Sequence, residues 1–393
     1  MNIVLKTDLR LMSLKGKLLL PIVQGGMGVG ISASRLAGTV AALGGLGTIS
    51  SVDLRRHHED LMDSTQGDVE KGVVDAANLQ ALDREINRAR ERSGGNGGIA
   101  VNIMKAVSQY PEYVRQSCES GADAVVVGAG LPLDLPELVQ DHPKVALIPI
   151  LSDVRGVTLL VKKWLRRKRL PDAVVLENPR FAAGHLGAAD DQSLNKPEYA
   201  FQRVLEGCRA LFRELGLEAE RIPLIAAGGI HRPEQLRQLM DWGADGVQMG
   251  TAFAVTEEGD AHENFKRVLL DAEPKDIVTF MSVAGLPARA VRTPWLDAYL
   301  HKEQKLQSVA RERACTEGFD CLAHCGLRDG VQRHGQFCID RQLAYALKGD
   351  VQRGLFFRSS EALPFGKAMK SVRELMDYML NGRSKTPGVV PAA

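Results

Sequence analysis

Two pairs of neighbouring residues in the second half of the chain, each containing glycine, are spaced as in a phosphate-binding site. Gly228 and Gly229 follow one short apolar run, Gly250 and Thr251 follow the next, and a helical pattern comes after each pair. Because glycine has no side chain, its backbone N–H group is open to a phosphate monoester, and two adjacent strand–glycine–helix units present several such groups together. The spacing therefore predicts phosphate binding, and we interpret the phosphate as that of FMN.

His185 is the residue whose type and setting best fit proton transfer. It lies between Gly184 and Gly187, which leaves its imidazole little local packing. Histidine can take or give a proton near neutral pH because its unperturbed pKa is about 6.5. A loop histidine held by structural hydrogen bonds is the alternative. We favour the catalytic role because the segment follows an apolar run that predicts a barrel strand.

Two further stretches have residues that could contact a flat ring. Gly25 and Gly26 follow the first apolar run, where their bare backbone could lie against such a ring, and Met27 could pack on it. A tight turn would use the same glycines. Asn102 ends the third apolar run, and its amide can both donate and accept a hydrogen bond at a flavin or uracil-like edge. Each signal is weak when taken alone.

The elements that must position these residues are short apolar runs that alternate with amphipathic segments. This alternation is typical of repeated βα units and predicts an α/β fold with a parallel sheet. Eight runs occur, the number that closes a (β/α)8 TIM barrel, in which catalytic groups lie at the carboxyl ends of the strands. The predicted strands are 18–23, 46–50, 98–102, 124–127, 145–150, 173–176, 223–227 and 245–249, and the predicted helices are 34–43, 79–92, 112–120, 135–141, 157–167, 198–215 and 233–242.

The barrel domain is predicted to span residues 1–292, with a charged and polar insertion at about 53–78. Within it, the segment 277–292 is interrupted by glycine and proline and is predicted to be a loop packed over the barrel mouth. Residues 293–382 are predicted to form a helical extension that contains cysteines. The tail, 383–393, is rich in Pro, Gly and Ala and is predicted to be disordered.

Several short motifs resemble those of one enzyme family when they are taken in order. They are PIVQGGMGVG, VNIM, AAGHLG, AAGGI and GADGVQMGTAF. Together they resemble the nitronate monooxygenase (2-nitropropane dioxygenase) family and the related flavin-type enoyl-acyl-carrier-protein reductases. SVAGLPARAVR also resembles the segment that follows the barrel in this group. The similarity covers roughly residues 21–292, which is most of the chain.

The resemblance implies an FMN-dependent oxidoreductase, most closely a nitronate monooxygenase that oxidises alkyl nitronates with O2. It implies that Gly25, Gly26, Met27, Asn102 and Gly184 contact the flavin, that Gly228, Gly229, Gly250 and Thr251 bind its phosphate, and that His185 is catalytic. The histidine would take a proton from a neutral nitroalkane or hold the nitronate anion. Two features depart from the family pattern: the acidic continuation that some members have after this histidine is missing, and a long region follows the barrel.

Four of the six cysteines lie close together in the predicted extension. Cys315, Cys321, Cys325 and Cys338 have the spacing C-x5-C-x3-C-x12-C. Four thiolates suit a [4Fe–4S] cluster or a structural zinc ion. Zinc sites favour C-x2–4-C pairs, which only Cys321 and Cys325 approach. The spacing therefore favours an iron–sulfur cluster over zinc, with no metal as the third alternative.

A second redox centre would favour a different enzyme. A flavin beside an iron–sulfur cluster suits an NAD(P)H-dependent enoyl or other double-bond reductase, which could use the same His185. An alternative from another class is a non-catalytic barrel that binds a phosphate ligand. The glycine pairs alone would fit that module, whereas a histidine between glycines at a strand end argues against it.

Composition and charge argue against several other functions. The net charge of +2 gives no reason to expect nucleic acid or an anionic membrane as a partner, and the basic run 162–169 has the pattern of a solvated helix end. No apolar stretch is long enough to span a bilayer, and the amino terminus does not resemble a signal peptide. We therefore expect a cytoplasmic enzyme with reduced cysteines and a small-molecule substrate. A homodimer is one assembly that fits this expectation.

Overall fold

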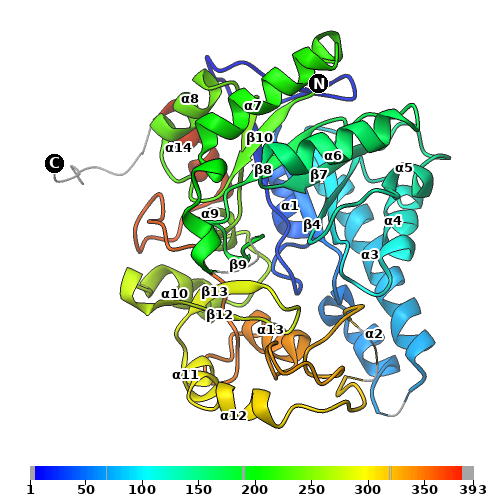
Figure 1. The fold of residues 1–393 in the computed structure, drawn as a ribbon, viewed down its shortest axis with the longest axis vertical. Helices are drawn as coiled ribbons and strands as arrows, with labels where there is room; N and C mark the ends of the chain where they lie inside the picture. The colour runs from blue at the N-terminus through cyan, green and yellow to red at the C-terminus, as the bar shows by residue number, and fades with distance from the viewer. Residues whose placement is uncertain (1–4, 68, 188–190, 318, 320, 383–393) are drawn as a thin grey trace.

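The computed structural model describes residues 5–67, 69–187, 191–317, 319 and 321–382, so the predicted disordered tail lies outside the described residues. Eight parallel strands form a closed barrel, which confirms the predicted fold (Figure 1). The strands are β3 (Ile22–Gln24), β4 (Leu46–Ser50), β5 (Gly98–Met104), β6 (Ala124–Gly128), β7 (Ala146–Leu151), β8 (Val174–Glu177), β10 (Leu224–Ala227) and β11 (Gly246–Met249). Each predicted strand overlaps an observed one, although β5 continues past Asn102.

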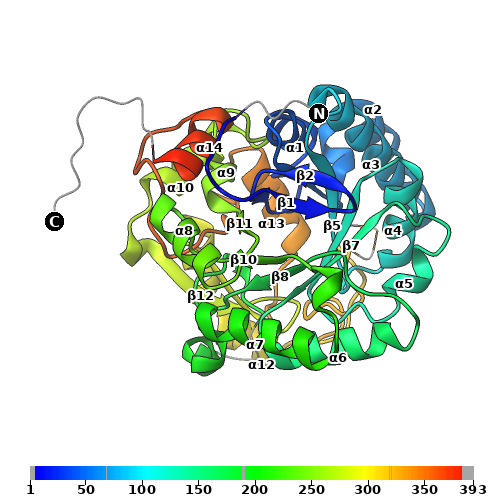
Figure 2. The same ribbon diagram turned by 90° about the horizontal axis from the view of Figure 1, so that it is seen from above.

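Alternate strand residues fill the interior of the barrel. Val23, Leu46, Ala100 and Ile225 are among the buried side chains of one compact cluster there, because successive strand residues point to opposite faces. The same cluster includes Met12 and other residues of an antiparallel hairpin, β1 (Met12–Leu14) and β2 (Lys17–Leu19). This hairpin lies across the amino-terminal end of the barrel (Figure 2), and the sequence analysis did not predict it.

Helices surround the barrel and bury their apolar faces against the strands. Those that follow the first seven strands are α1 (Ser34–Ala42), α3 (Lys71–Ser93), α4 (Tyr110–Glu119), α5 (Leu135–Leu138), α6 (Val154–Leu165), α7 (Phe201–Glu214) and α8 (Pro233–Asp241). The ring is completed by α14 (Val372–Asn381), which contacts both α8 and α1 (Figure 2). Its buried residues Val372, Leu375, Met376 and Met379 have helical spacing. The last helix of the chain therefore takes the place of the eighth barrel helix.

Between β11 and α14 the chain makes a long excursion over the barrel mouth. It contains α9 (Thr251–Ala254), α10 (Glu263–Asp271), α11 (Pro294–Leu300), α12 (Glu303–Ser308) and α13 (Ile339–Leu347). These elements, apart from α9, form the lower part of the molecule in Figure 1. Turns rather than helices connect α12 to α13, and these turns carry the first three cysteines of the predicted metal site.

The prediction of a loop at 277–292 is wrong, because this segment forms a β-hairpin. Strand β12 (Ile277–Met281) pairs antiparallel with β13 (Pro287–Val291), and β13 pairs in turn with the two-residue strand β9 (Gly184–His185). Gly285 has a φ of +74° in the connecting turn, a conformation that glycine adopts without strain. Gly285 therefore lies in the turn of this hairpin, and Pro287 is the first residue of its second strand.

The charged insertion near residue 53 is folded and largely packed. It contains the 3-10 helix η1 (Leu54–His57), the helix α2 (Glu59–Ser64) and the first turns of α3. Asp53 is fully buried and accepts a hydrogen bond from Arg55 at 2.7 Å. Arg56 donates to Asp340 of α13 at 2.6 Å. The charges of this segment therefore connect the barrel to the excursion over its mouth.

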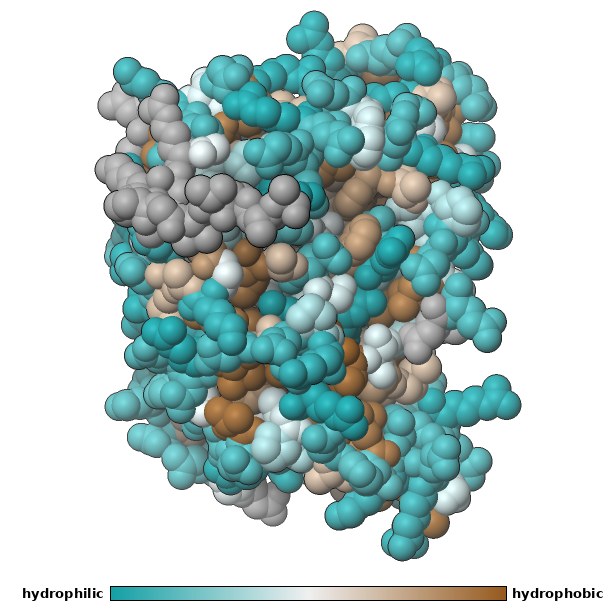
Figure 3. Space-filling view, turned by 90° about the vertical axis from the view of Figure 1, so that its left-hand side faces the viewer, coloured by the Kyte–Doolittle hydropathy of each residue, from teal (hydrophilic) through white to brown (hydrophobic). Residues whose placement is uncertain are grey.

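The surface seen in Figure 3, the left side of Figure 1, is mostly hydrophilic and has smaller groups of apolar residues between the polar ones. In the parts of the chain that the structure describes, no helix has the length and apolar character needed to cross a membrane.

A substitution of Gly47 tests how closely α1 packs on the barrel. A Cβ at this position of β4 would lie 1.9 Å from the carbonyl oxygen of Ala37 in α1. We expect Gly47→Ala to destabilise the fold by about 1–3 kcal/mol, because strand and helix must move apart. Thermal unfolding measures the effect. Gly72→Ala is the control, since its added methyl group meets nothing within 4 Å and should leave the Tm unchanged or slightly raised. Equal Tm values for both variants would contradict this packing.

Candidate functional site

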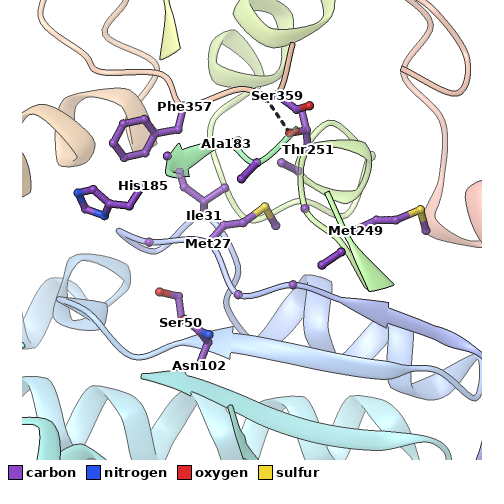
Figure 4. A pocket seen from close by; sticks show the side chains of 18 of the residues that line it. Met27, Ile31, Ser50, Asn102, Ala183, His185, Met249, Thr251, Phe357 and Ser359 are labelled. Carbon is purple, nitrogen blue, oxygen red and sulfur yellow. Dashed lines mark hydrogen bonds between the residues drawn. The ribbon is translucent and has the colours of Figure 1, made fainter. Parts of the chain in front are cut away.

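One pocket at the carboxyl ends of the barrel strands contains every residue that the sequence predicts for flavin and substrate. It holds about 1700 Å³ of space, including its open mouth. His185, Gly25, Gly26, Met27, Asn102, Gly184, Gly228, Gly229, Gly250 and Thr251 all line it. Figure 4 shows Met27, Asn102, His185 and Thr251 around the same space. The barrel therefore brings together residues that are far apart in the sequence.

The loop after β3 is pressed against the neighbouring strands. The backbone N–H of Gly25 donates to the carbonyl oxygen of Met249 at 2.9 Å, and that of Met27 donates to the hydroxyl of Ser32 at 2.9 Å. A Cβ at Gly26 would lie 2.3 Å from the Cβ of Asn102. Any side chain at this position would force the two apart, so the glycine lets loop and asparagine form one continuous surface.

The two glycine loops predicted for phosphate binding lie side by side, because β10 and β11 are paired neighbours. Gly228 and Gly229 have φ angles of +107° and +71°, which glycine alone adopts readily. Gly250 precedes α9, and a Cβ there would lie 3.7 Å from the sulfur of Met27. The second loop is thus next to the loop after β3. The binding of an anion by these two loops stays a prediction.

The imidazole of His185 is positioned by strand pairing. His185 lies opposite Ala288 in the β9–β13 ladder. Gly184 has a φ of +64°, which lets the chain turn into this short strand. The guanidinium of Arg289 donates to the carbonyl oxygens of Arg180 and Ala182 at 2.9 and 2.7 Å. The hairpin therefore holds the histidine segment in two ways. Strand β13 pairs with β9, and Arg289 of β13 donates hydrogen bonds to the carbonyl groups that precede the histidine.

The ring of His185 keeps an unused nitrogen. Its Nε2 atom is buried and has no hydrogen-bond partner among the described residues. Burial lowers the pKa of His185 to about 4, so the imidazole is neutral at pH 7. A neutral ring with a free nitrogen can accept a proton or a hydrogen bond from a molecule in the pocket.

Glu177 is a candidate that the sequence analysis missed. It is the last residue of β8, and it lines the pocket. Burial raises the pKa of Glu177 to about 7, because the surroundings disfavour its charged form. A carboxyl group whose pKa is near neutrality, in the same pocket as a neutral histidine, is a second group able to exchange protons there. The signal was available as a single acidic residue at the end of an apolar strand.

A segment near the end of the chain forms one side of the pocket, which no motif in the sequence predicts. The ring of Phe357 lies 6.2 Å from that of His185, measured between centroids. The hydroxyl of Ser359 donates to the carbonyl oxygen of Phe181 at 2.9 Å, and its backbone N–H donates to the hydroxyl of Thr251 at 3.4 Å (Figure 4). This segment therefore links the histidine loop to the second glycine loop.

The four cysteines predicted as metal ligands are each half-buried, and of these Cys321 is among the described residues that line the pocket. Burial raises the pKa of Cys321 well above its usual value, and the nearby Asp340 and the thiols of Cys338, Cys325 and Cys315 raise it further. Nevertheless, no three His, Cys, Asp or Glu side chains in the described part of the chain are arranged to hold a metal ion. The iron–sulfur site stays a prediction.

Fold and pocket together define a (β/α)8 barrel with two paired glycine loops and a histidine at its mouth. The chain belongs to the nitronate monooxygenase family, whose model matches residues 11–361. It is therefore an oxidoreductase, and the resemblance predicted from the motifs is confirmed.

Two curated relatives are described as probable nitronate monooxygenases. A probable nitronate monooxygenase from Staphylococcus saprophyticus is 26% identical over 294 residues, which cover 72% of this chain and 77% of the relative. A second one, from Bacillus subtilis, is 26% identical over 285 residues, which cover 70% of this chain and 78% of the relative.

Solved structures support the fold. FabK from Thermotoga maritima has a TM-score of 0.62 at 21% identity, with 92% of this chain and 91% of that chain covered. A nitroalkane oxidase from Streptomyces ansochromogenes has a TM-score of 0.61 at 20% identity, with 93% and 96% covered. At such low identity these matches show the architecture only. The chemistry must be inferred from the residues of the site.

The titration of Glu177 gives a testable pH dependence. Its folded pKa of about 7 lies above the unfolded value, so its contribution to stability is present at low pH and is lost as the pH rises from about 4.5 to 7. We expect Glu177→Gln to stabilise the cofactor-free protein by about 1–3 kcal/mol more at pH 8 than at pH 5. Urea unfolding at both pH values measures the difference. An equal effect at both would show that this carboxyl group titrates normally.

Proposed function

We propose that this protein is an FMN-dependent nitronate monooxygenase that oxidises alkyl nitronates with O2. The observation that carries the proposal is the pocket itself, which brings the neutral imidazole of His185 together with the paired glycine loops. Membership of the nitronate monooxygenase family supports the same activity.

The residues in the pocket fit FMN. The backbone N–H groups of Gly228, Gly229, Gly250 and Thr251, all in the lining of the pocket, would bind its phosphate, because glycine has no side chain of its own to cover its N–H group. Gly25, Gly26, Met27, Asn102 and Gly184 would lie against its ring system, where the absence of a Cβ at Gly26 leaves a flat surface. When bound, FMN supplies the redox chemistry, and the protein supplies binding and orientation.

The chain itself would handle the proton. The neutral imidazole of His185 can take the proton from the carbon next to the nitro group of a neutral nitroalkane. With a nitronate as substrate, the imidazole can instead donate a hydrogen bond once it is protonated. The ring of Phe357 lies 6.2 Å from the imidazole between centroids, and such an apolar neighbour disfavours the charged form of the histidine.

A second candidate is an NAD(P)H-dependent reductase of enoyl or other double bonds. One observation favours it: the thiol-bearing turns reach the pocket through Cys321, with three more cysteines nearby. A redox centre at that position could deliver electrons to the pocket, which a monooxygenase does not require. In this reaction His185 would donate a proton instead of accepting one.

Oxygen consumption separates the two candidates. Purified protein should consume O2 when ethyl nitronate is added, and NADPH alone should give little consumption. Under argon, the nitronate should bleach the flavin absorbance faster than NADPH does. Rapid bleaching by NADPH with no response to nitronates would replace the monooxygenase by the reductase.

Removal of the imidazole should separate binding from turnover. With a neutral nitroalkane as substrate, we expect His185→Ala to retain FMN, because the proposed phosphate and ring contacts come from other residues. We expect it to lose about 100- to 10,000-fold in kcat, because the group that takes the proton is missing. Flavin absorbance and oxygen uptake measure the two properties. His324→Ala is the control, since this histidine is exposed and its loss should change neither. Unreduced activity of His185→Ala would overturn the catalytic assignment.

Iron analysis tests the predicted cluster. If Cys315, Cys321, Cys325 and Cys338 hold a [4Fe–4S] cluster, protein purified without oxygen should contain about four iron and four sulfide ions per chain. Cys325→Ser should lose the iron, while Cys118→Ser, a substitution of a buried core cysteine, should retain it. Protein free of iron and sulfide under these conditions would rule the cluster out.

A further inference from the structure

The lining of the pocket supplies no permanent positive charge for a phosphate. The described residues that line it include no lysine or arginine, whereas they include the carboxyl group of Glu361. That side chain is close to the first glycine loop, because a Cβ at Gly229 would lie 2.9 Å from its Cγ atom. A phosphate monoester carries a charge of about −1.5 to −2 near neutral pH, and a charge that leaves water needs compensation. A permanent positive charge for it has to come from behind the lining.

Arg358 is a buried cation that is linked to the second glycine loop. It lies between the lining residues Phe357 and Ser359, and it is only 5% exposed. Its guanidinium donates from Nη1 to the carbonyl oxygen of Ser359 at 3.0 Å. The backbone N–H of Ser359 donates in turn to the hydroxyl of Thr251 at 3.4 Å. A single residue therefore connects the guanidinium to the loop that is proposed to hold the phosphate.

Arg358 has hydrogen-bond partners without an opposite charge. Its Nε atom donates to the carbonyl oxygen of Leu269, in the last turn of α10, at 2.8 Å. Burial lowers the pKa of Arg358, and no carboxyl group of the described residues raises it. An arginine nevertheless keeps its charge at neutral pH. Because a buried charge without a counter-charge is costly, an anion bound close by offsets that cost.

Other positive groups near the glycine loops fit this role less well. His231 lines the pocket, but a histidine is charged only when it is protonated. Arg180 is exposed, so water and salt screen its charge. Arg289 is buried, but its guanidinium binds carbonyl groups of the histidine loop. Arg358 combines burial, a permanent charge and a link to the second glycine loop.

From this arrangement we infer that Arg358 supplies the positive charge for the phosphate monoester at the glycine loops, acting through Ser359 and Thr251 as a positioning residue. The inference rests on the proposed function, which identifies this monoester as the phosphate of FMN. The glycine loops bind the phosphate oxygens, and Arg358 favours the charged phosphate from a distance. Affinity for FMN therefore depends on Arg358, whereas affinity for riboflavin, which has the same ring system and no phosphate, does not.

A purely structural role is the alternative, because carbonyl groups at the end of a helix favour a cation. In that role Arg358 only holds α10 against the segment that contains Ser359. The two roles differ in one respect. Loss of a structural link weakens the binding of both flavins equally, whereas loss of a counter-charge weakens the binding of FMN alone.

Flavin titrations of the full-length protein, freed of its flavin, test the inference. Quenching of flavin fluorescence gives the Kd of FMN and of riboflavin, and the ratio of the riboflavin Kd to the FMN Kd reports the phosphate. Two unit charges about 10 Å apart in a partly buried setting change Kd by roughly tenfold. We therefore expect this ratio to fall about tenfold in Arg358→Gln and to fall less in Arg358→Lys, which keeps the charge.

Arg353→Gln is the matched control. This arginine lies five residues earlier in the same segment, is exposed and pairs with Asp350, so the variant removes the same charge and should keep the wild-type ratio. An unchanged ratio in Arg358→Gln, or an equal loss of both flavins, would overturn the inference. Should this variant fail to fold, the wild-type protein still provides a test, because riboflavin bound as tightly as FMN would overturn the inference as well.

Inorganic phosphate separates this inference from the proposed function. Its binding to the flavin-free protein is measured by isothermal titration calorimetry. A protein that binds neither flavin but binds phosphate, and loses this binding in Arg358→Gln, would support the counter-charge and reject the proposed function. Nitronate oxidation with bound FMN, together with a wild-type ratio in Arg358→Gln, would support the proposed function and reject the counter-charge.

Discussion

The antiparallel pairing of β9 with β13 is the interaction on which the site depends. Barrel strands alone leave His185 in a glycine-flanked loop with many conformations. The ladder to Ala288, together with the hydrogen bonds of Arg289 to the preceding carbonyl groups, fixes the segment over the pocket. The barrel supplies the strand ends, and the hairpin supplies the constraint that turns one loop histidine into a positioned group.

A second constraint is the low polarity of the space that these elements enclose. It keeps the imidazole of His185 uncharged and shifts the titration of Glu177 toward neutral pH. In the described lining, lysine and arginine are missing, so anion binding falls to backbone N–H groups of the glycine loops. Backbone groups do not titrate and do not move like long side chains. Phosphate binding and proton transfer can therefore share one pocket with little interference between charges.

Sequence patterns predicted those features of the fold and site that depend on residues close together in the chain. The eight strands, the glycines at their ends and His185 after β8 all follow from apolar periodicity and from the missing side chains of glycine. The hairpin at 277–292, the segment around Phe357 and the place of α14 in the helix ring were not predicted. Each of these depends on a partner far away in the chain, and no local spacing encodes such a partner. Glu177 was missed although its local signal was present.

The central claim is that the pocket binds FMN. Its most direct test is the absorption spectrum of freshly purified protein, combined with mass spectrometry of the small molecules released on denaturation. We expect flavin absorbance and close to one FMN per chain. Colourless protein that also fails to take up added FMN would contradict this claim, because the paired glycine loops and the loop at Gly26 would then have another role.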